Sequence, residues 1–336
     1  MGILKIKEKA RGWARSIRDV SSGILTVVLS SCVVCAVVSC SRPQAAAQSA
    51  PPPAFQYLGE WGTSGNEPGQ LQDPRTLSTD AVGNVYIADD GKPVQVEKFD
   101  SLGHPLLVFD VTGIQNDWDI AVDSGQAIFL VDVSHAQIHI YSPEGEVFRT
   151  LFFRYRRDFS DPTSIAMESG GDFYLADFET GRIALMNPRG RTLEAWSKPF
   201  GMPVKKWAPF RIRLGLDGNL YVADAANQKI DKLSADGHYM ASWDFPFSDS
   251  KTTRDAPKAY GLAVFQNFVT ASDLDKRLLS VWTLDGQQKL TVDFSQHPEW
   301  GENTAPTDIA FTPKGELLVL DRPDSRVLRF KINVAE

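Results

Sequence analysis

A pattern that recurs six times between Leu71 and Phe330 constrains the fold of this chain more than any other feature. Each copy combines a Gly or Asn turn with a short apolar strand that usually ends in Asp, and the clearest copy is Gly218–Asp224 (GNLYVAD). The residues that end the strands of successive copies are 43, 45, 47, 48 and 49 positions apart. A period of about 40–50 residues, with about four short strands per unit, is typical of a β-propeller. The sequence therefore predicts an all-β, six-bladed β-propeller.

The two ends of the repeat region indicate how the ring would close. The sixth repeat ends after its third strand, near Val334, whereas Phe55–Gly62 (FQYLGEWG) reads as a single strand before the first repeat. We predict that this N-terminal strand completes the last blade, which would cover an exposed sheet edge. The propeller domain is then predicted over residues 55–336.

Motifs in the first repeat resemble a known family of repeats. Gly69–Pro74 (GQLQDP), Gly83–Asp89 (GNVYIAD) and Phe99–Gly103 (FDSLG) are similar to the NHL repeat, and the resemblance covers residues 55–334 in six copies. It implies a six-bladed NHL-type propeller, here of the bacterial lipoprotein type. NHL propellers serve as enzymes, scaffolds and ligand-binding modules, so the resemblance implies a fold and leaves the function open.

The first 39 residues predict a lipoprotein signal peptide. Six Lys and Arg residues precede an uncharged apolar run over Gly23–Ser39, which is short for a membrane span. Val37–Cys40 resembles a bacterial lipobox, which implies cleavage before Cys40 and its acylation, for example with palmitate. Cys32 fits a similar pattern, and an uncleaved N-terminal anchor is an alternative. Residues 40–54, rich in Pro and Ala, predict a tether.

The predicted anchor and the net charge indicate where the protein is located and which partners it can have. We expect an exported body that is lipid-anchored to a membrane, and Ser41 resembles the sorting pattern for the outer membrane, with the body periplasmic or surface-facing. Loss of residues 1–39 would take the formal net charge from −7 to −11, since six basic and two acidic residues are removed. A body with this negative net charge would repel nucleic acid, which argues against a nucleic-acid partner. Because a propeller closes on itself, we expect a monomeric body.

One candidate site is a ring of residues that precede the aliphatic residue of each inner strand. Inner strands line the central channel of a propeller, so this ring should lie near a channel mouth. An Arg between two Asp residues could be a structural ion network or a binding site for a small polar ligand, in which Arg would clamp an anion. In repeat order, the ring residues are Thr76, Asp119, Ser164, Arg211, Gly261 and Asp308.

A second candidate is a docking face on the loops that connect consecutive blades. These loops carry basic and aromatic residues in an otherwise acidic body, and Trp, Tyr and Arg dominate the energetics of interfaces. Ordinary loop composition is the alternative. The candidate interface residues are Arg154, Arg156, Arg157, Lys206, Trp207, Tyr260 and Trp300.

The histidines bear on whether the protein is an enzyme. A zinc site needs several converging ligands, and none of the five His residues occupies the ring. The NHL-fold amidating lyases use His ligands near the channel mouth, and the sugar-lactonase propellers use an early metal-binding Glu; neither pattern matches this chain. We therefore predict no catalytic residue, metal ligand or cofactor, and leave Zn²⁺ and Ca²⁺ open as alternatives.

The sequence thus favours a membrane-anchored, exported propeller that acts as a binding or scaffold module in the cell envelope. Its partner would be an envelope protein, a peptide or a glycan. The alternatives are a metal-dependent enzyme of the lyase or lactonase kind, and a sensor that binds a small polar ligand at the channel mouth.

Overall fold

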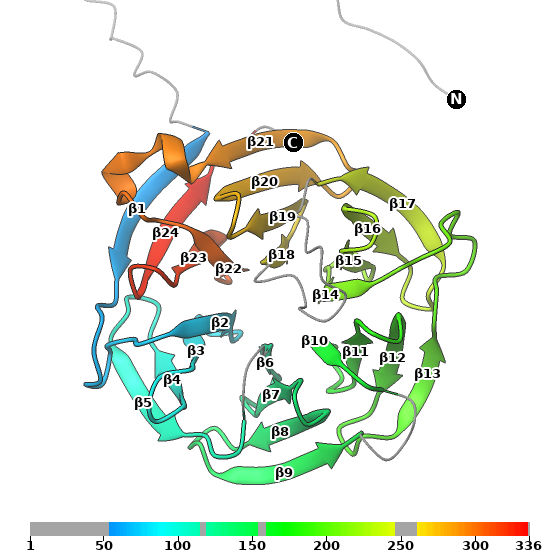
Figure 1. The fold of residues 1–336 in the computed structure, drawn as a ribbon, viewed down its shortest axis with the longest axis horizontal. Helices are drawn as coiled ribbons and strands as arrows, with labels where there is room; N and C mark the ends of the chain where they lie inside the picture. Colours follow the sequence, from blue (N-terminus) through cyan, green and yellow to red (C-terminus); the bar gives the residue numbers. More distant parts are fainter. Residues whose placement is uncertain (1–53, 115–118, 154–158, 246–260, 335–336) are drawn as a thin grey trace, which may run out of the picture. The chain divides into compact units, whose positions relative to one another are not determined.

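The computed structural model describes residues 54–114, 119–153, 159–245 and 261–334. These residues form six four-stranded antiparallel sheets, which stand as blades around a ring (Figure 1). Blades 1 to 5 take their strands in chain order, from β2–β5 to β18–β21, and blade 6 consists of β22, β23, β24 and β1. The predicted six-bladed β-propeller is therefore confirmed.

Each blade places its strands from the centre of the ring to its perimeter. The inner strands are β2 (Pro74–Thr79), β6 (Ile120–Val122), β10 (Pro162–Met167), β14 (Pro209–Leu214), β18 (Leu262–Phe265) and β22 (Pro306–Phe311). The second strands are β3 (Val85–Asp89), β7 (Ile128–Asp132), β11 (Phe173–Asp177), β15 (Leu220–Asp224), β19 (Phe268–Asp273) and β23 (Glu316–Asp321). The third strands are β4 (Gln95–Phe99), β8 (Gln137–Tyr141), β12 (Arg182–Met186), β16 (Lys229–Leu233), β20 (Leu278–Thr283) and β24 (Arg326–Ile332). The outer strands are β5 (Pro105–Asp110), β9 (Val147–Phe152), β13 (Thr192–Trp196), β17 (Tyr239–Asp244), β21 (Gln288–Asp293) and β1 (Phe55–Trp61).

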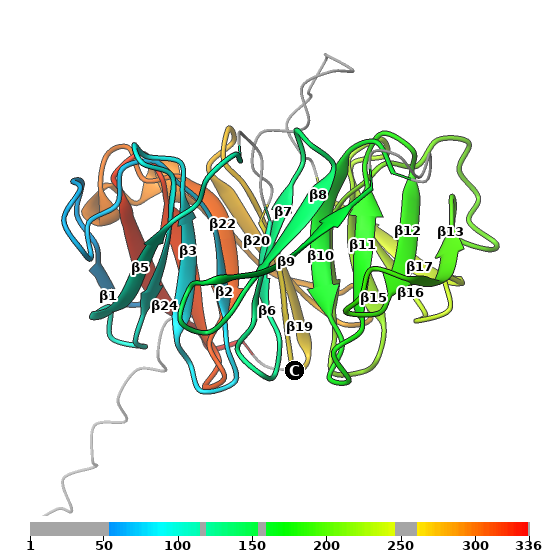
Figure 2. The ribbon, with the colours of Figure 1, turned by 90° about the horizontal axis from the view of Figure 1, so that it is seen from below.

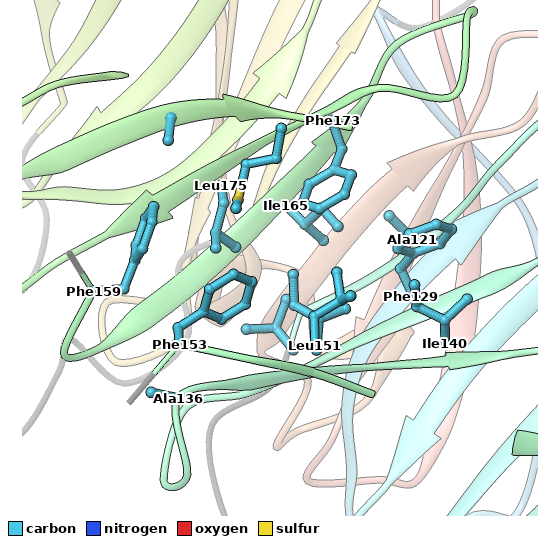
Figure 3. Close-up of a cluster of buried hydrophobic side chains, with 14 of the residues drawn as sticks. Ala121, Phe129, Ala136, Ile140, Leu151, Phe153, Phe159, Ile165, Phe173 and Leu175 are labelled. Atoms are coloured by element: carbon cyan, nitrogen blue, oxygen red, sulfur yellow. The ribbon is translucent and has the colours of Figure 1, made fainter. Parts of the chain in front are cut away.

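The core is divided among the six contacts between neighbouring blades. A second strand such as β11 is buried along its whole length, because both of its faces pack against other blades. Each pair of adjacent blades shares one cluster of buried apolar side chains. Figure 3 shows the cluster between blades 2 and 3, where the rings of Phe129 and Phe173 lie 5.7 Å apart. The ring is thus held together by sheet-to-sheet packing that repeats at every blade boundary.

The N-terminal strand closes the ring, as predicted. β1 pairs antiparallel with β24, in a register that joins Phe55 to Ile332 and Trp61 to Val327. The ring of Phe55 stacks on that of Phe330 at 4.3 Å, so the closure contributes apolar packing as well as a hydrogen-bonded ladder. The closing strand leaves blade 6 with the same four-stranded width as the others.

Glycines in the turns before the outer strands let neighbouring blades approach closely. Gly237 has a φ of +84°, and a Cβ atom there would lie 2.7 Å from the Trp196 ring of the preceding blade. Gly103 has a φ of +89° and contacts Trp61 in the same way. Only glycine combines this backbone conformation with so short an approach. The glycines in these turns therefore let their blades pack closely against the outer strand of the preceding blade.

The strands run between two opposite faces of the ring (Figure 2). We call the face with the connections between blades the loop face, and the face with the turns between inner and second strands the turn face. The connection between blades 5 and 6 contains two short 3-10 helices, η1 (Phe294–Gln296) and η2 (Pro298–Trp300). Within the described part of the chain, no helix is long and apolar enough to cross a membrane.

Candidate functional site

The structure brings the predicted ring residues together in the interior of the propeller. Thr76, Ser164, Arg211 and Asp308 lie in inner strands, and Asp119 directly precedes β6. Thr76, Asp119, Ser164 and Asp308 are fully buried, and Arg211 is 4% exposed. The polar atoms of these residues form hydrogen bonds and ion pairs with one another and with nearby backbone groups.

Asp119 is the centre of this network. Its carboxylate pairs with Nη1 of Arg211 at 2.8 Å and with Nη1 of Arg213 at 2.9 Å, and it accepts a hydrogen bond from the Ser164 hydroxyl at 2.6 Å. Burial alone would raise the pKa of Asp119, but the two guanidinium groups outweigh burial and lower the pKa to about 2. Asp119 is therefore a permanently charged, fully paired group at neutral pH.

Ring side chains also join each blade to the next through the backbone. The carboxylate of Asp119 accepts the Ile165 N–H at 3.0 Å, that of Asp308 accepts the Leu77 N–H at 3.2 Å, and the Ser164 hydroxyl accepts the Ile212 N–H at 3.0 Å. In all three cases the acceptor belongs to one blade and the donor to the following blade. This arrangement gives the ring a structural role as a set of inter-blade hydrogen bonds.

Gly261 is the member of the ring without a side chain, and its surroundings explain why. A Cβ atom at this position would lie 2.4 Å from Oγ of Ser272 and 2.9 Å from the backbone N of Ile309. Instead, the Gly261 N–H donates to Oγ of Ser272 at 3.2 Å. Ser272 stands where the other repeats have Asp, so the two departures from the repeat pattern, Gly261 and Ser272, compensate each other.

Arg213 is a member of the network that our sequence reasoning missed. It follows Arg211 by two positions on β14, so both side chains leave the strand on the same side. Its Nη1 and Nη2 atoms contact the two carboxylate oxygens of Asp119 at 2.9 and 3.2 Å, from a strand two blades away. The two-residue repeat of strands was the signal that could have found it.

The Asp residues that end the second strands hold neighbouring loops in place by accepting hydrogen bonds from backbone N–H groups. Asp89 accepts N–H groups from Gln72 and Asp73, which precede its blade, and from Gly91 in its own turn. Asp177 likewise accepts from the loop before its blade and from its own turn. In both blades the carboxylate therefore ties the loop that enters the blade to the turn after the second strand.

Two histidines converge on one of these carboxylates. Nδ1 of His135 lies 2.8 Å from Oδ2 of Asp132, and Nε2 of His139 lies 3.6 Å from the same oxygen. In the part of the chain that the structure describes, no group of three or more His, Cys, Asp and Glu residues could hold a metal ion.

The docking residues predicted on the loops fall into two groups. Arg154, Arg156, Arg157 and Tyr260 lie outside the described residues, as do Cys40 and the whole of the predicted signal peptide. Lys206, Trp207 and Trp300 are described, and both tryptophans are largely buried, at 7% and 8% exposure. Trp300 stacks on His297 and packs against Phe330 beside the closing strand, so its side chain anchors the loop in which it lies.

Lys206 and Trp207 belong to a pocket on the loop face between blades 3 and 4, which we call the lysine pocket. The pocket has a volume of about 440 Å³. Lys198, Lys205 and Lys206 line it with exposed side chains, while Glu179 is the acidic residue in its wall. Lys198 is held in place because its Nζ atom donates to the Val204 carbonyl at 2.8 Å. The pocket is therefore a local excess of positive charge on an acidic body.

The floor of this pocket rests on a buried acidic residue. The indole N–H of Trp207 donates to Oδ2 of Asp231 at 3.2 Å, and Asp231 in β16 is fully buried. Burial raises the pKa of Asp231 to about 8, and the neighbouring Asp224 carboxyl group contributes in the same direction. Sequence reasoning missed Asp231, because the pattern of a strand does not show that a polar residue in it is buried.

Comparisons with known proteins support the fold. No family model matches the chain, and no curated protein matches it either. Among solved structures, a streptogramin B lyase is 18% identical with a TM-score of 0.57, over 83% of this chain and 98% of that one. Virginiamycin B lyase from Staphylococcus aureus is 13% identical with a TM-score of 0.54, over 83% of this chain and 100% of that one.

A third similar structure is a β-propeller domain. The Cps50 (Swd1) β-propeller domain of Myceliophteria thermophila is 11% identical with a TM-score of 0.57, over 83% of this chain and 100% of that one. Likeness at these identities shows the propeller fold alone, because one fold carries many unrelated activities.

Proposed function

We propose that this propeller is a binding module that recognises an acidic partner protein through the pocket between blades 3 and 4. The observation that carries the proposal is the group of three exposed lysines, Lys198, Lys205 and Lys206, around a pocket of about 440 Å³. The rest of the body carries a negative net charge, so an acidic partner would be repelled elsewhere and attracted here. The fixed indole of Trp207 gives the pocket a rigid floor.

The setting that we propose for this activity is the cell envelope. The basic segment, the apolar run and the lipobox-like Val37–Cys40 support export and lipid anchoring, and residues 40–54 support a tether between membrane and propeller. Acylation at Cys40 predicts that the mature protein is recovered in the membrane fraction. Cys40→Ala should then leave it unprocessed or release it, as fractionation and mass spectrometry of the N-terminus would show.

The test is affinity purification of the tagged full-length protein from its own membranes. We expect a stoichiometric acidic partner that is lost when Lys205→Glu and Lys206→Glu are combined. A matched control replaces Lys314, exposed on the turn face, and Lys331, exposed at the end of β24, with Glu, and should retain the partner. A partner that survives the Lys205 and Lys206 changes, or capture of a neutral glycan in place of a protein, would contradict the proposal.

A further inference from the structure

A second cavity lies on the opposite side of the propeller from the lysine pocket. It has a volume of about 310 Å³ and opens on the turn face, where the turns after β2 and β22 contribute Asp80, Thr312 and Pro313. Its walls come from the inner strands β2, β18 and β22, and Arg213 of β14 belongs to its lining. The buried ring around Asp119 lies further along the same inner strands, so the cavity has a charged end inside and an open mouth at the turns.

Small inner-strand residues form part of the cavity wall. Two positions after each ring residue, five of the six blades carry only a hydroxymethyl or a methyl side chain. Arg213 is the exception, and it reaches across to Asp119. The five small residues of this layer are Ser78, Ala121, Ala166, Ala263 and Ala310. Ser78, Ala263 and Ala310 line the cavity, so larger side chains at these three positions would reduce the room for a guest.

Arg213, which lines this cavity, has hydrogen-bond donors that are not used within the described residues. Its Nη1 atom donates to Asp119, to Ser164 and to the Ile212 carbonyl, and Nη2 donates once, to Asp119. A guanidinium has five N–H groups, and within the described residues neither Nε nor the second N–H of Nη2 has an acceptor. The side chain is 19% exposed.

The guanidinium of Arg213 also stays charged. Burial disfavours its charged form, but the carboxylates of Asp119 and Asp308 outweigh burial and raise the pKa of Arg213. An arginine with a free edge in a partly buried cavity is suited to a carboxylate, whose two oxygens match the spacing of adjacent N–H groups.

The other charged side chain at the cavity does not compete for this role. Asp80 accepts hydrogen bonds from the backbone N–H groups of Val82, Gly83 and Asn84 and from the hydroxyl of Tyr86. Its carboxylate oxygens are therefore already hydrogen-bonded within its own blade. Thr79 likewise donates its hydroxyl to the Phe311 carbonyl at 2.8 Å.

The outer half of the cavity is apolar and aromatic. The rings of Phe265 and Phe311 stack at 5.3 Å with an interplanar angle of 28°, and both residues line the cavity with part of their surface exposed. Pro313 and Val264 continue this surface. A volume near 300 Å³ is at the lower end of small-molecule sites, which combine apolar walls with a few placed polar groups.

We infer that this cavity is a binding site for a small aromatic monocarboxylate, whose carboxylate pairs with the free edge of Arg213 and whose ring packs beside Phe265 and Phe311. The inference is independent of the proposed function, because the lysine pocket lies on the other face and shares no lining residue with this cavity. The two sites would let one face of the propeller bind a small molecule while the other binds a protein.

The test uses benzoate as the probe and benzamide, of the same shape without the charge, as its comparison. Binding to the purified full-length protein is measured by calorimetry and by saturation-transfer NMR. We expect benzoate to bind with a dissociation constant of about 0.1–1 mM, in keeping with its size. We expect benzamide to bind at least roughly tenfold more weakly, because hydrogen bonds to charged groups are the stronger ones.

Three variants locate the binding. Ala310→Leu, which adds volume to the cavity wall and replaces no residue of the Asp119 network, should weaken benzoate binding at least roughly tenfold. Leu216→Ala, at an exposed turn outside the lining, should bind benzoate normally, and so should the protein with Lys205→Glu and Lys206→Glu. Circular dichroism confirms that each variant is folded. No benzoate binding up to 10 mM (about tenfold above the weakest expected constant), equal affinity for benzamide, or unchanged binding in a folded Ala310→Leu protein would each overturn the inference.

Discussion

The buried acid beneath the lysine pocket makes the stability of the propeller depend on pH in a direction opposite to that of most carboxylates. Asp231 is fully buried, its Oδ1 atom has no hydrogen-bond partner in the described structure, and burial raises its pKa to about 8. The folded state therefore favours the neutral acid, whereas an unfolded Asp ionises near pH 3.9. Replacement by Asn keeps the shape and an acceptor for Trp207, and removes the titration.

The size of the effect follows from the linkage between protons and folding. Between the two pKa values the folded protein binds more protons than the unfolded chain, so this group lowers the free energy of unfolding as pH rises, by about 1.4 kcal/mol per pH unit. From pH 6 to pH 9 the loss amounts to roughly 3 kcal/mol, because it stops once pH exceeds about 8. Asp231→Asn should lack this loss, so its stability relative to the natural protein should improve by roughly 3 kcal/mol over that interval.

Urea unfolding of both proteins at several pH values between 6 and 9 measures this difference directly. Titrating groups that do not interact with Asp231, such as Glu97 with its pKa raised by burial to about 7, are shared by both proteins and cancel in the comparison. Asp217→Asn in the same blade is the control, since hydrogen bonds to Asn219, Lys232 and Tyr221 outweigh burial and lower the pKa of Asp217 to about 2. Its stability difference should not change between pH 6 and 9. A difference for Asp231→Asn that is equally constant would refute the reasoning.

Three further perturbations test the closing strand of the propeller and the polar residues near its axis. Deletion of residues 55–62 removes the partner of β24 and its aromatic packing, so the melting temperature should fall sharply; an unchanged melt would exclude the closing role. Asp119→Ala leaves two arginines without their shared carboxylate and should cost about 3–5 kcal/mol in chemical unfolding, whereas a cost below about 1 kcal/mol would show that the network does not hold the blades. Gly261→Ala places a methyl group 2.9 Å from the Ile309 nitrogen and should cost about 1–3 kcal/mol, with a neutral effect counting against the close contact.

The fold could be predicted from the sequence because its cause is local and repeated. A strand that ends in Asp, a turn with Gly and a nearly constant period each follow from backbone requirements that recur in most blades, as Gly237 and Asp177 show. Closure by the N-terminal strand could also be predicted, since the sixth repeat lacked an outer strand and Phe55–Gly62 had no partner of its own.

The site was less predictable because it depends on contacts between blades. Position in the repeat identified Asp119 and Arg211 as neighbours across the channel, but only the structure shows Arg213 reaching Asp119 from two blades away. The type of residue suggested Trp207 as an interface residue, but only the structure shows that its ring is largely buried over Asp231. Repeat position thus predicts which residues are near the axis, and not how far a long side chain reaches.

The pairing of β1 with β24 also determines when the propeller can become complete. Tyr57 pairs with Phe330, so the strand that is synthesised first must wait for a partner that is synthesised last. Contacts this distant in sequence form slowly, since a long chain must be ordered before they are made. Blades 1 to 5 can each assemble from one continuous segment, but blade 6 cannot. A chain interrupted between β21 and β24 would therefore contain five complete sheets and still lack a closed ring, so closure separates the finished molecule from a nearly finished one.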